Sequence, residues 1–141
     1  RGFSSLMDYN AGDGKRILLV DDDTGVSDVC SQMLKYHGYE VTPSITGEDA
    51  IDLFSVGHFD LVILDVGLPG ISGLDCAREL RRRRRDVKIL ISSGDCAELK
   101  RQKAPVSSNF HVLQKPYTMS ELICSVSNVM GANSEASSSI L

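Results

Sequence analysis

Two short apolar runs, each ending in carboxylates, constrain the fold of this chain more than any other feature. Residues 17–20 (ILLV) lead into the triplet Asp21–Asp23, and residues 61–64 (LVIL) lead into Asp65. Runs that are apolar throughout are typical of strands buried on both faces of a parallel sheet. If two such strands lie side by side, their carboxylates meet at one edge, where like charges about 4 Å apart repel by about 4 kcal/mol at an effective dielectric constant of about 20. The runs therefore predict a site for a hard divalent cation such as Mg²⁺.

The composition is that of an ordinary globular domain. With 141 residues, of which 42% are apolar, the chain is long enough for one domain with a sizeable core. Its net charge of −4 gives no general attraction to nucleic acid or to anionic membrane. We find no signal peptide and no apolar stretch near the ~18 residues of a membrane helix, so we expect no membrane association. The four cysteines form no C-x-x-C pair and no zinc-like set, so we expect reduced thiols in a cytoplasmic protein.

The two ends of the chain differ in composition from its middle. Residues 1–14 carry Gly, Ser and Asp without a period, so we expect a linker or the tail of an upstream element. Residues 132–141 are rich in Ser, so we expect a disordered tail. The sequence starts at Arg1 and not at Met, so we expect it to be cut from a longer protein or to be trimmed. The folded domain is then predicted at residues 15–131.

Between these ends, strand-like and helix-like segments alternate five times. The predicted strands are residues 16–20, 39–42, 61–64, 88–92 and 110–113. The predicted helices run over residues 24–37, 46–56, about 72 to the arginine run at 81–85, about 95–103, and 118–130. On the first helix, the residues expected to face the core are Val26, Val29, Met33 and Leu34. Five such units predict a parallel sheet covered by helices on both faces, with ligands bound at the carboxyl ends of the strands.

Polar segments follow four of these strands: Asp21–Asp23, Asp65, Ser93-Gly94 and Lys115-Pro116. Each has an ordinary explanation when taken alone. Acids are favourable at a helix N-terminus, Ser-Gly is common in turns, and an isolated Lys is usually solvated. Together they supply a nucleophilic carboxylate, a cation site, a hydroxyl donor and an ammonium group. These are the parts that phosphoryl transfer requires.

Four segments carry a family resemblance that covers residues 15–131: ILLVDDD, LVILDVGLPGISGLD, ILISSGD and VLQKPY. The chain resembles the receiver domain of two-component response regulators, and LQKPY resembles receivers of hybrid sensor histidine kinases. The resemblance implies an α/β fold, the flavodoxin-like (βα)5 doubly wound parallel sheet with strand order 2-1-3-4-5. It implies a phosphoacceptor that receives its phosphoryl group from a histidine kinase or a histidine phosphotransfer protein and switches conformation. Such a domain catalyses only its own phosphorylation and dephosphorylation.

By position, the resemblance assigns the site residues. Asp65 is the implied phosphoacceptor and a Mg²⁺ ligand. Asp22 is implied as a direct metal ligand, Asp21 as a ligand through water, and Gly67 as a ligand through its backbone carbonyl. Asp23 stands outside the implied site.

The resemblance also assigns the groups that bind phosphoryl oxygens. These are Ser93 and Lys115, and the Lys115-Pro116 peptide bond is implied to be cis. Many family members have Tyr or Phe three residues before the Lys, an aromatic that swings inward on phosphorylation. This chain has Val112 there, so the position offers no aromatic relay.

Two surfaces and several alternatives stay open. The arginine run 81–85 is either a solvated helix end that matches the helix dipole or a docking patch for an acidic partner, and we expect no nucleic acid. The face formed by the strands at 88–92 and 110–113 and the helix at 95–103 is one that family members use for partners or phosphorylation-dependent dimers.

The alternatives are a degenerate receiver that acts as a scaffold, a flavodoxin-like FMN carrier, and a small phosphatase of the haloacid dehalogenase type. The phosphatase leaves Asp65 without a role, and the acidic triplet would repel an FMN phosphate.

Overall fold

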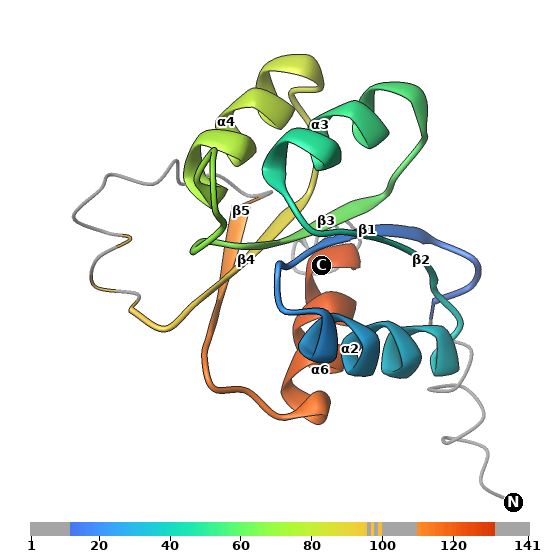
Figure 1. Ribbon diagram of the computed structural model, residues 1–141. Helices are drawn as coiled ribbons and strands as arrows, with labels where there is room; N and C mark the ends of the chain where they lie inside the picture. Colours follow the sequence, from blue (N-terminus) through green and yellow to red (C-terminus); the bar gives the residue numbers. More distant parts are fainter. Residues whose placement is uncertain (1–11, 96, 98, 100–109, 132–141) are drawn as a thin grey trace, which may run out of the picture.

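Five parallel strands form one sheet in the computed structural model, which describes residues 12–95, 97, 99 and 110–131 (Figure 1). The strands are β1 (Arg16–Val20), β2 (Glu40–Ser44), β3 (Leu61–Asp65), β4 (Ile89–Ser93) and β5 (Phe110–Gln114). Their order is β2-β1-β3-β4-β5, and every paired neighbour runs parallel. The predicted flavodoxin-like order is therefore confirmed.

Helices cover both faces of this sheet (Figure 1). In the described part of the chain they are α2 (Thr24–Tyr36), α3 (Gly47–Val56), α4 (Gly73–Arg83) and α6 (Met119–Met130). Helices α2 and α6 lie on one face, and α3 and α4 lie on the other. The chain therefore leaves β1 and β3, which are neighbours, toward opposite faces. Ligands of open α/β sheets bind at such a point, outside the carboxyl ends of the strands.

The sheet separates two apolar cores, because side chains alternate along each strand. On β1, Leu18 and Val20 belong to the core shared with α3 and α4, whereas Ile17 and Leu19 belong to the core shared with α2 and α6. Strands β3 and β4 are buried along their whole length. The apolar runs of the sequence are thus confirmed as strands covered on both faces.

Each of these helices begins at a polar N-cap residue whose side chain accepts a backbone N–H. The caps are Asp23, Thr46, Ser72 and Thr118. At α6 the cap is a full capping box, since the Glu121 side chain accepts the Thr118 N–H at 2.8 Å while Thr118 Oγ1 accepts the Glu121 N–H at 3.0 Å. Three of these caps lie in the loops that follow β1, β3 and β5. The same loops carry residues of the predicted site, so the start of each helix and the site residues are positioned together.

Helix α2 buries a stripe that shares only Leu34 with the one predicted. Val26 and Val29, expected to face the core, are 38% and 52% exposed, and Met33 is only half-buried. The buried residues are Ser27, Cys30, Ser31 and Leu34. This stripe has proper helical spacing, and three of its side chains are small, so the helix packs close to the sheet and turns its valines outward.

Strand β2 also differs from its prediction. It covers Glu40–Ser44 instead of residues 39–42 and includes Pro43. A proline is tolerated there because β2 is an edge strand that pairs with β1 alone.

Three predictions fall outside the described residues. The tail predicted at 132–141 lies wholly outside them, and the tail predicted at 1–14 and the helix predicted at 95–103 lie mostly outside them. Residues 12–14 form a turn in which the Gly12 N–H donates to the His37 carbonyl at 2.7 Å. Among the helices of the described part of the chain, none has the length and apolar character needed to cross a membrane.

Candidate functional site

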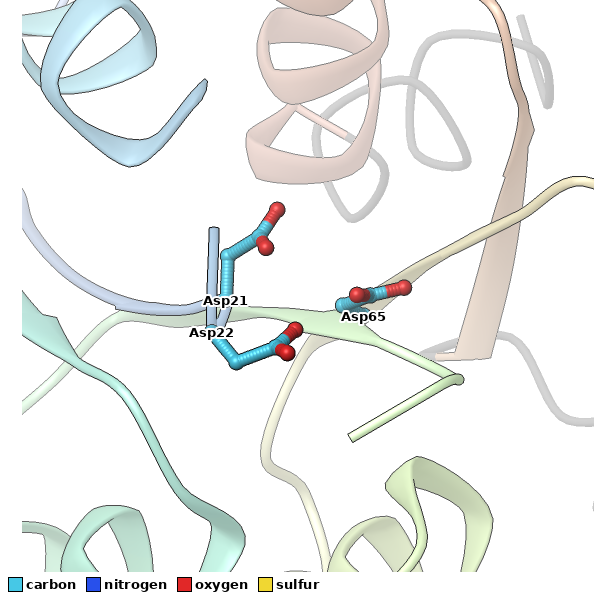
Figure 2. A group of neighbouring side chains, drawn as sticks. All are labelled: Asp21, Asp22 and Asp65. Atoms are coloured by element: carbon cyan, nitrogen blue, oxygen red, sulfur yellow. The ribbon is translucent and has the colours of Figure 1, made fainter. Parts of the chain in front are cut away.

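Three carboxylates meet at the carboxyl ends of β1 and β3 (Figure 2). Asp21 and Asp22 directly follow β1, and Asp65 is the last residue of β3. Val20 is paired with Leu64 in the sheet, so the residues that follow lie side by side. One carboxylate oxygen from each acid lies within 4.8 Å of the others. Asp21 and Asp65 are buried, whereas Asp22 is exposed.

The acidic triplet divides between this cluster and the next helix. Asp21 accepts the Asp23 backbone N–H at 2.9 Å. Burial raises the pKa of Asp21, the Asp23 N–H opposes that rise, and the negative charge of Asp65 adds to it. The Asp23 side chain instead caps α2 by accepting the Val26 N–H at 3.1 Å. Asp23 therefore lies outside the cluster, as expected.

Lys115 reaches Asp65 from β5, which is two strands away from β3. Its Nζ atom donates to Asp65 Oδ1 at 3.0 Å. The Gly67 backbone N–H donates to the same oxygen at 3.3 Å. The Lys115-Pro116 peptide bond is cis, as the resemblance implies. A carboxylate and an ammonium group separated by 50 positions in the sequence are thus in direct contact.

Ser93 lies at the same edge of the sheet. It follows Ser92, the residue paired with Asp65, and is only 2% exposed. Its Oγ accepts the Asp95 backbone N–H at 3.0 Å. This bond uses a lone pair and leaves the hydroxyl hydrogen as a donor for an incoming oxygen. The fold therefore brings Asp65, Ser93 and Lys115, which the sequence singles out separately, to one edge.

The loop of residues 66–72 after Asp65 is held by a residue that the sequence does not single out. Glu48, in the first turn of α3, accepts the Ile71 backbone N–H at 3.0 Å. Gly70 has a φ of +73°, and a Cβ at this position would lie 2.8 Å from the Glu48 carboxylate. These contacts set the path of the loop that carries Gly67. No local pattern indicates them, because Glu48 and Ile71 are 23 positions apart.

The residues of the cluster fit a divalent cation. Three carboxylates and one ammonium leave two uncompensated negative charges when all four groups are ionised. The side-chain atoms that could bind the metal are all carboxylate oxygens, which suit Mg²⁺ better than a softer metal. Nothing lies within 4 Å of where a Gly67 Cβ would stand, so the loop beside Asp65 is open on that side.

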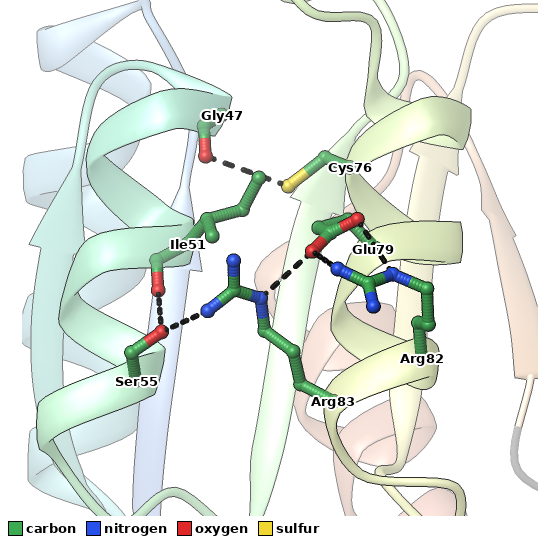
Figure 3. Close-up of polar contacts among 7 residues, drawn as sticks. All are labelled: Gly47, Ile51, Ser55, Cys76, Glu79, Arg82 and Arg83. Carbon is green, nitrogen blue, oxygen red and sulfur yellow. Dashed lines mark hydrogen bonds and ion pairs between the residues drawn. The ribbon is translucent and has the colours of Figure 1, made fainter.

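Two residues of the arginine run 81–85, Arg82 and Arg83, make contacts inside the domain (Figure 3). The Glu79 carboxylate accepts from Arg82 Nη2 at 2.5 Å and from Arg83 Nε at 2.9 Å. Arg83 Nη1 also donates to Ser55 Oγ at 2.6 Å, which joins α4 to α3. The bond to Ser55 favours a structural role for Arg83, whereas the Arg82 side chain is 71% exposed and pairs with Glu79 of its own helix, as a solvated helix end does.

The sheet order and its acidic edge define a flavodoxin-like α/β domain of the CheY-like class. The model of the response regulator receiver domain matches residues 17–127, and the chain belongs to this family. Receiver domains are the phosphoacceptors of two-component signalling, and histidine kinases phosphorylate them. The family predicted from the four sequence segments is confirmed, and the phosphatase alternative is not favoured.

Curated and solved relatives agree with this assignment. The response regulator SaeR of Staphylococcus aureus (strain USA300) is 28% identical over 114 residues, which are 81% of this chain and 50% of SaeR. The chain thus spans about half the length of the curated relatives it matches.

Among solved structures, the response regulator TrrA of Thermotoga maritima in complex with Mg²⁺-BeF is 34% identical, with a TM-score of 0.71 over 82% of this chain and 98% of TrrA. The receiver domain of the sensor histidine kinase PA1611 of Pseudomonas aeruginosa, with a magnesium ion in its active site cleft, is 28% identical. Its TM-score is 0.75 over 84% of this chain and 98% of that domain.

Proposed function

We propose that Asp65 accepts a phosphoryl group from a phosphohistidine of a histidine kinase or of a histidine phosphotransfer protein. In this proposal Asp22, Asp65 and the Gly67 carbonyl hold Mg²⁺ directly, and Asp21 holds it through water. Ser93 and Lys115 bind phosphoryl oxygens. The observation that carries the proposal is the 3.0 Å contact of Lys115 Nζ with the carboxylate of Asp65 inside the acidic cluster. When bound, Mg²⁺ would neutralise part of the negative charge of the carboxylates and of the phosphoryl oxygens.

The transfer itself requires little of the protein beyond positioning and charge. An Asp65 carboxylate oxygen attacks phosphorus, so one O–P bond forms as the N–P bond to the donor imidazole breaks. The leaving nitrogen keeps the electron pair of that bond and takes a proton from solvent. The new group brings about −1.5 to −2 charges. The Lys115 ammonium and the Ser93 hydroxyl are the nearby donors that would meet this charge.

Intact mass measurement tests the acceptor. The wild type is incubated with Mg²⁺ and acetyl phosphate beside Asp65→Asn and a control, Asp28→Asn, which removes an exposed acid of α2. We expect one added phosphoryl group on the wild type and on the control, and none on Asp65→Asn. A phosphoryl group on Asp65→Asn would refute the assignment.

If the wild type shows no added mass, a beryllofluoride titration separates two explanations. Binding of beryllofluoride in Mg²⁺ indicates a working site whose phosphoryl group is short-lived. Absence of binding indicates the degenerate receiver that acts as a scaffold.

We further propose that the phosphodonor protein docks in the apolar groove beside the site. The groove has a volume of about 760 Å³ and is lined by Val26 and Val29 of α2 and by Pro116, Tyr117 and Met119. Lys115, which binds Asp65, also lines it. A donor must bring its imidazole to Asp65, so a surface continuous with Lys115 is well placed to hold it.

A charge placed in the groove tests this docking site. Val29 is 52% exposed, so Val29→Lys leaves the core intact. We expect slower phosphotransfer from a phosphorylated histidine phosphotransfer protein and an unchanged rate from acetyl phosphate, which needs no protein contact. Equal rates from the protein donor to the variant and to the wild type would refute the docking site.

Attachment to a hybrid histidine kinase and dimerisation on phosphorylation stay predictions. A receiver of a sensor histidine kinase is among the similar structures, which supports the first. Val112 of β5 is 43% exposed on the face predicted for dimers, which supports the second. The molecular mass in solution with and without beryllofluoride tests the dimer, and an unchanged mass would contradict it.

A further inference from the structure

Gln114 links the segments that carry Ser93 and Lys115. Its side-chain Nε2 donates to the Gly94 carbonyl at 3.2 Å and to the Lys115 carbonyl at 2.7 Å. Both acceptors are carbonyl oxygens, so the NH₂ end of the amide must face them, with one hydrogen for each. Gly94 directly follows Ser93 in the sequence. The amide therefore connects the segment after β4 with the segment after β5.

Backbone bonds join the same two segments beside the site. The Lys115 N–H donates to the Ser93 carbonyl at 2.8 Å, and Ser93 is paired with Gln114 in the sheet. The Asp95 N–H donates to Ser93 Oγ at 3.0 Å. The Ser93 hydroxyl, the Gly94 carbonyl and the Lys115 backbone thus belong to one connected hydrogen-bond network in which Gln114 contributes the side-chain link.

We propose that Gln114 is a positioning residue that holds the Ser93 hydroxyl and the Lys115 ammonium at a fixed separation, so that both reach a phosphoryl group on Asp65 together. The inference rests on the proposed function of Asp65. A group that ties the two backbones makes the movement of either segment depend on the other. Gln114 stands two residues after Val112 on the same face of β5, and Val112 itself has neither a polar nor an aromatic group to couple the strand to Ser93.

The chemistry of the amide makes the proposal specific. Leucine has a similar size but donates no hydrogen bond, so Gln114→Leu removes the link without adding charge. Gln114 is exposed, so the change leaves both apolar cores intact. Gln32→Leu, the same substitution at an exposed position of α2, is the matched control.

Two affinities measured on the whole chain separate positioning from general damage. The first is for Mg²⁺ alone, and the second is for beryllofluoride in saturating Mg²⁺. We expect Gln114→Leu to bind Mg²⁺ within about twofold of the wild type, because no bond of Gln114 reaches the acidic cluster. We expect it to bind beryllofluoride about five- to tenfold more weakly, the loss that two exposed neutral hydrogen bonds can produce. Gln32→Leu should match the wild type in both.

A spectroscopic signal tests the same link directly. The side-chain NH₂ resonances of Gln114 are assigned by their absence from spectra of Gln114→Leu. We expect them to shift when beryllofluoride is added to the Mg²⁺-loaded wild type, because the two carbonyl acceptors move with Ser93 and Lys115. Those of Gln32 should stay in place.

Three results would overturn the inference. Unchanged beryllofluoride affinity in Gln114→Leu would show that the link does not position the site. An equal loss of Mg²⁺ and beryllofluoride affinity would show a general structural effect. Unshifted Gln114 resonances in a wild type that binds beryllofluoride would show that the link takes no part in the response. A wild type that binds no beryllofluoride would instead refute the proposed function, and the inference with it.

Discussion

Replacing Asp21 by Asn should make the domain more stable without metal and less responsive to Mg²⁺. Asp21 is buried within 4.8 Å of two other carboxylates. Its bond with the Asp23 N–H survives in the variant, because the Asn side-chain oxygen accepts in the same way. The substitution therefore removes the charge and keeps the local geometry.

The expected size follows from the cluster. Two unit charges separated by 4.8 Å, the upper limit of the spacing here, repel by about 3.5 kcal/mol at an effective dielectric constant of about 20. Lys115 offsets part of this repulsion and solvent screens the exposed Asp22, so we expect a net gain of about 1–2 kcal/mol. For a domain of this size, the melting temperature should rise by about 4–8 °C.

The pH dependence of this gain has a definite sign. The pKa of Asp21 is raised in the native state above its ordinary value of 3.8, so the native state holds that proton more tightly than the unfolded state. The wild type therefore loses stability as the pH rises from 3.8 through the native pKa. The advantage of Asp21→Asn should be complete at neutral pH and should vanish as the pH falls toward 3.8.

Thermal denaturation with and without Mg²⁺ measures both effects, and Asp28→Asn is the charge-matched control. Mg²⁺ should stabilise the wild type more than Asp21→Asn, because binding to the native state adds to stability in proportion to affinity. A variant less stable than the wild type at neutral pH without Mg²⁺ would refute the reasoning. It would show that the bond of the charged Asp21 with the Asp23 N–H outweighs the repulsion.

Three further substitutions test the framework of the site. Leu80→Ala at a fully buried position of α4 should cost about 2–5 kcal/mol in urea denaturation, and a cost below about 1 kcal/mol would contradict its place in the core. Thr118→Ala should cost about 1 kcal/mol by removing the capping box of α6, and Thr118→Ser should recover most of it; equal losses would argue against the cap. Gly73→Ala would place a Cβ 2.4 Å from the Asp65 carbonyl oxygen, so we expect a loss of about 1–3 kcal/mol and weaker Mg²⁺ binding, and a neutral effect on both would show that the loop adapts.

The framework could be predicted because its signals are local. A strand buried on both faces needs an unbroken apolar run, and the acid that ends the run lies at the sheet edge wherever the strand is placed. The order of β1 and β3 then decides that Asp21, Asp22 and Asp65 meet.

The buried stripe of α2 could not be predicted from hydrophobicity. The pattern selects Val26 and Val29 because they are the larger apolar side chains, but the helix approaches the sheet through Ser27 and Cys30. A helix that packs close to a sheet needs small side chains at the contact as well as apolar ones. The sequence of one helix does not show whether size or apolar character decides which face is buried. The exposed valines then become part of the groove beside Lys115.

Bonds between distant side chains and backbone atoms were also beyond prediction. The bond from Gln114 to Gly94 spans 20 positions, and it depends on how two loops approach each other in space. The side-chain type offers no guide, because exposed Gln and Glu residues occur throughout such domains for solubility.

Strand β3, buried at all five of its positions, has a consequence for how a signal can leave the domain. Strands β1 and β4 pair with β3 on its two sides, and helices pack on both of its faces, so the end of β3 is held rigidly. If a charge is added at the end of β3 and the strand cannot move, the groups around that charge must rearrange instead. A phosphoryl group on Asp65, as proposed, would therefore act first on the loops at the carboxyl end of the sheet, while β3 itself keeps its place.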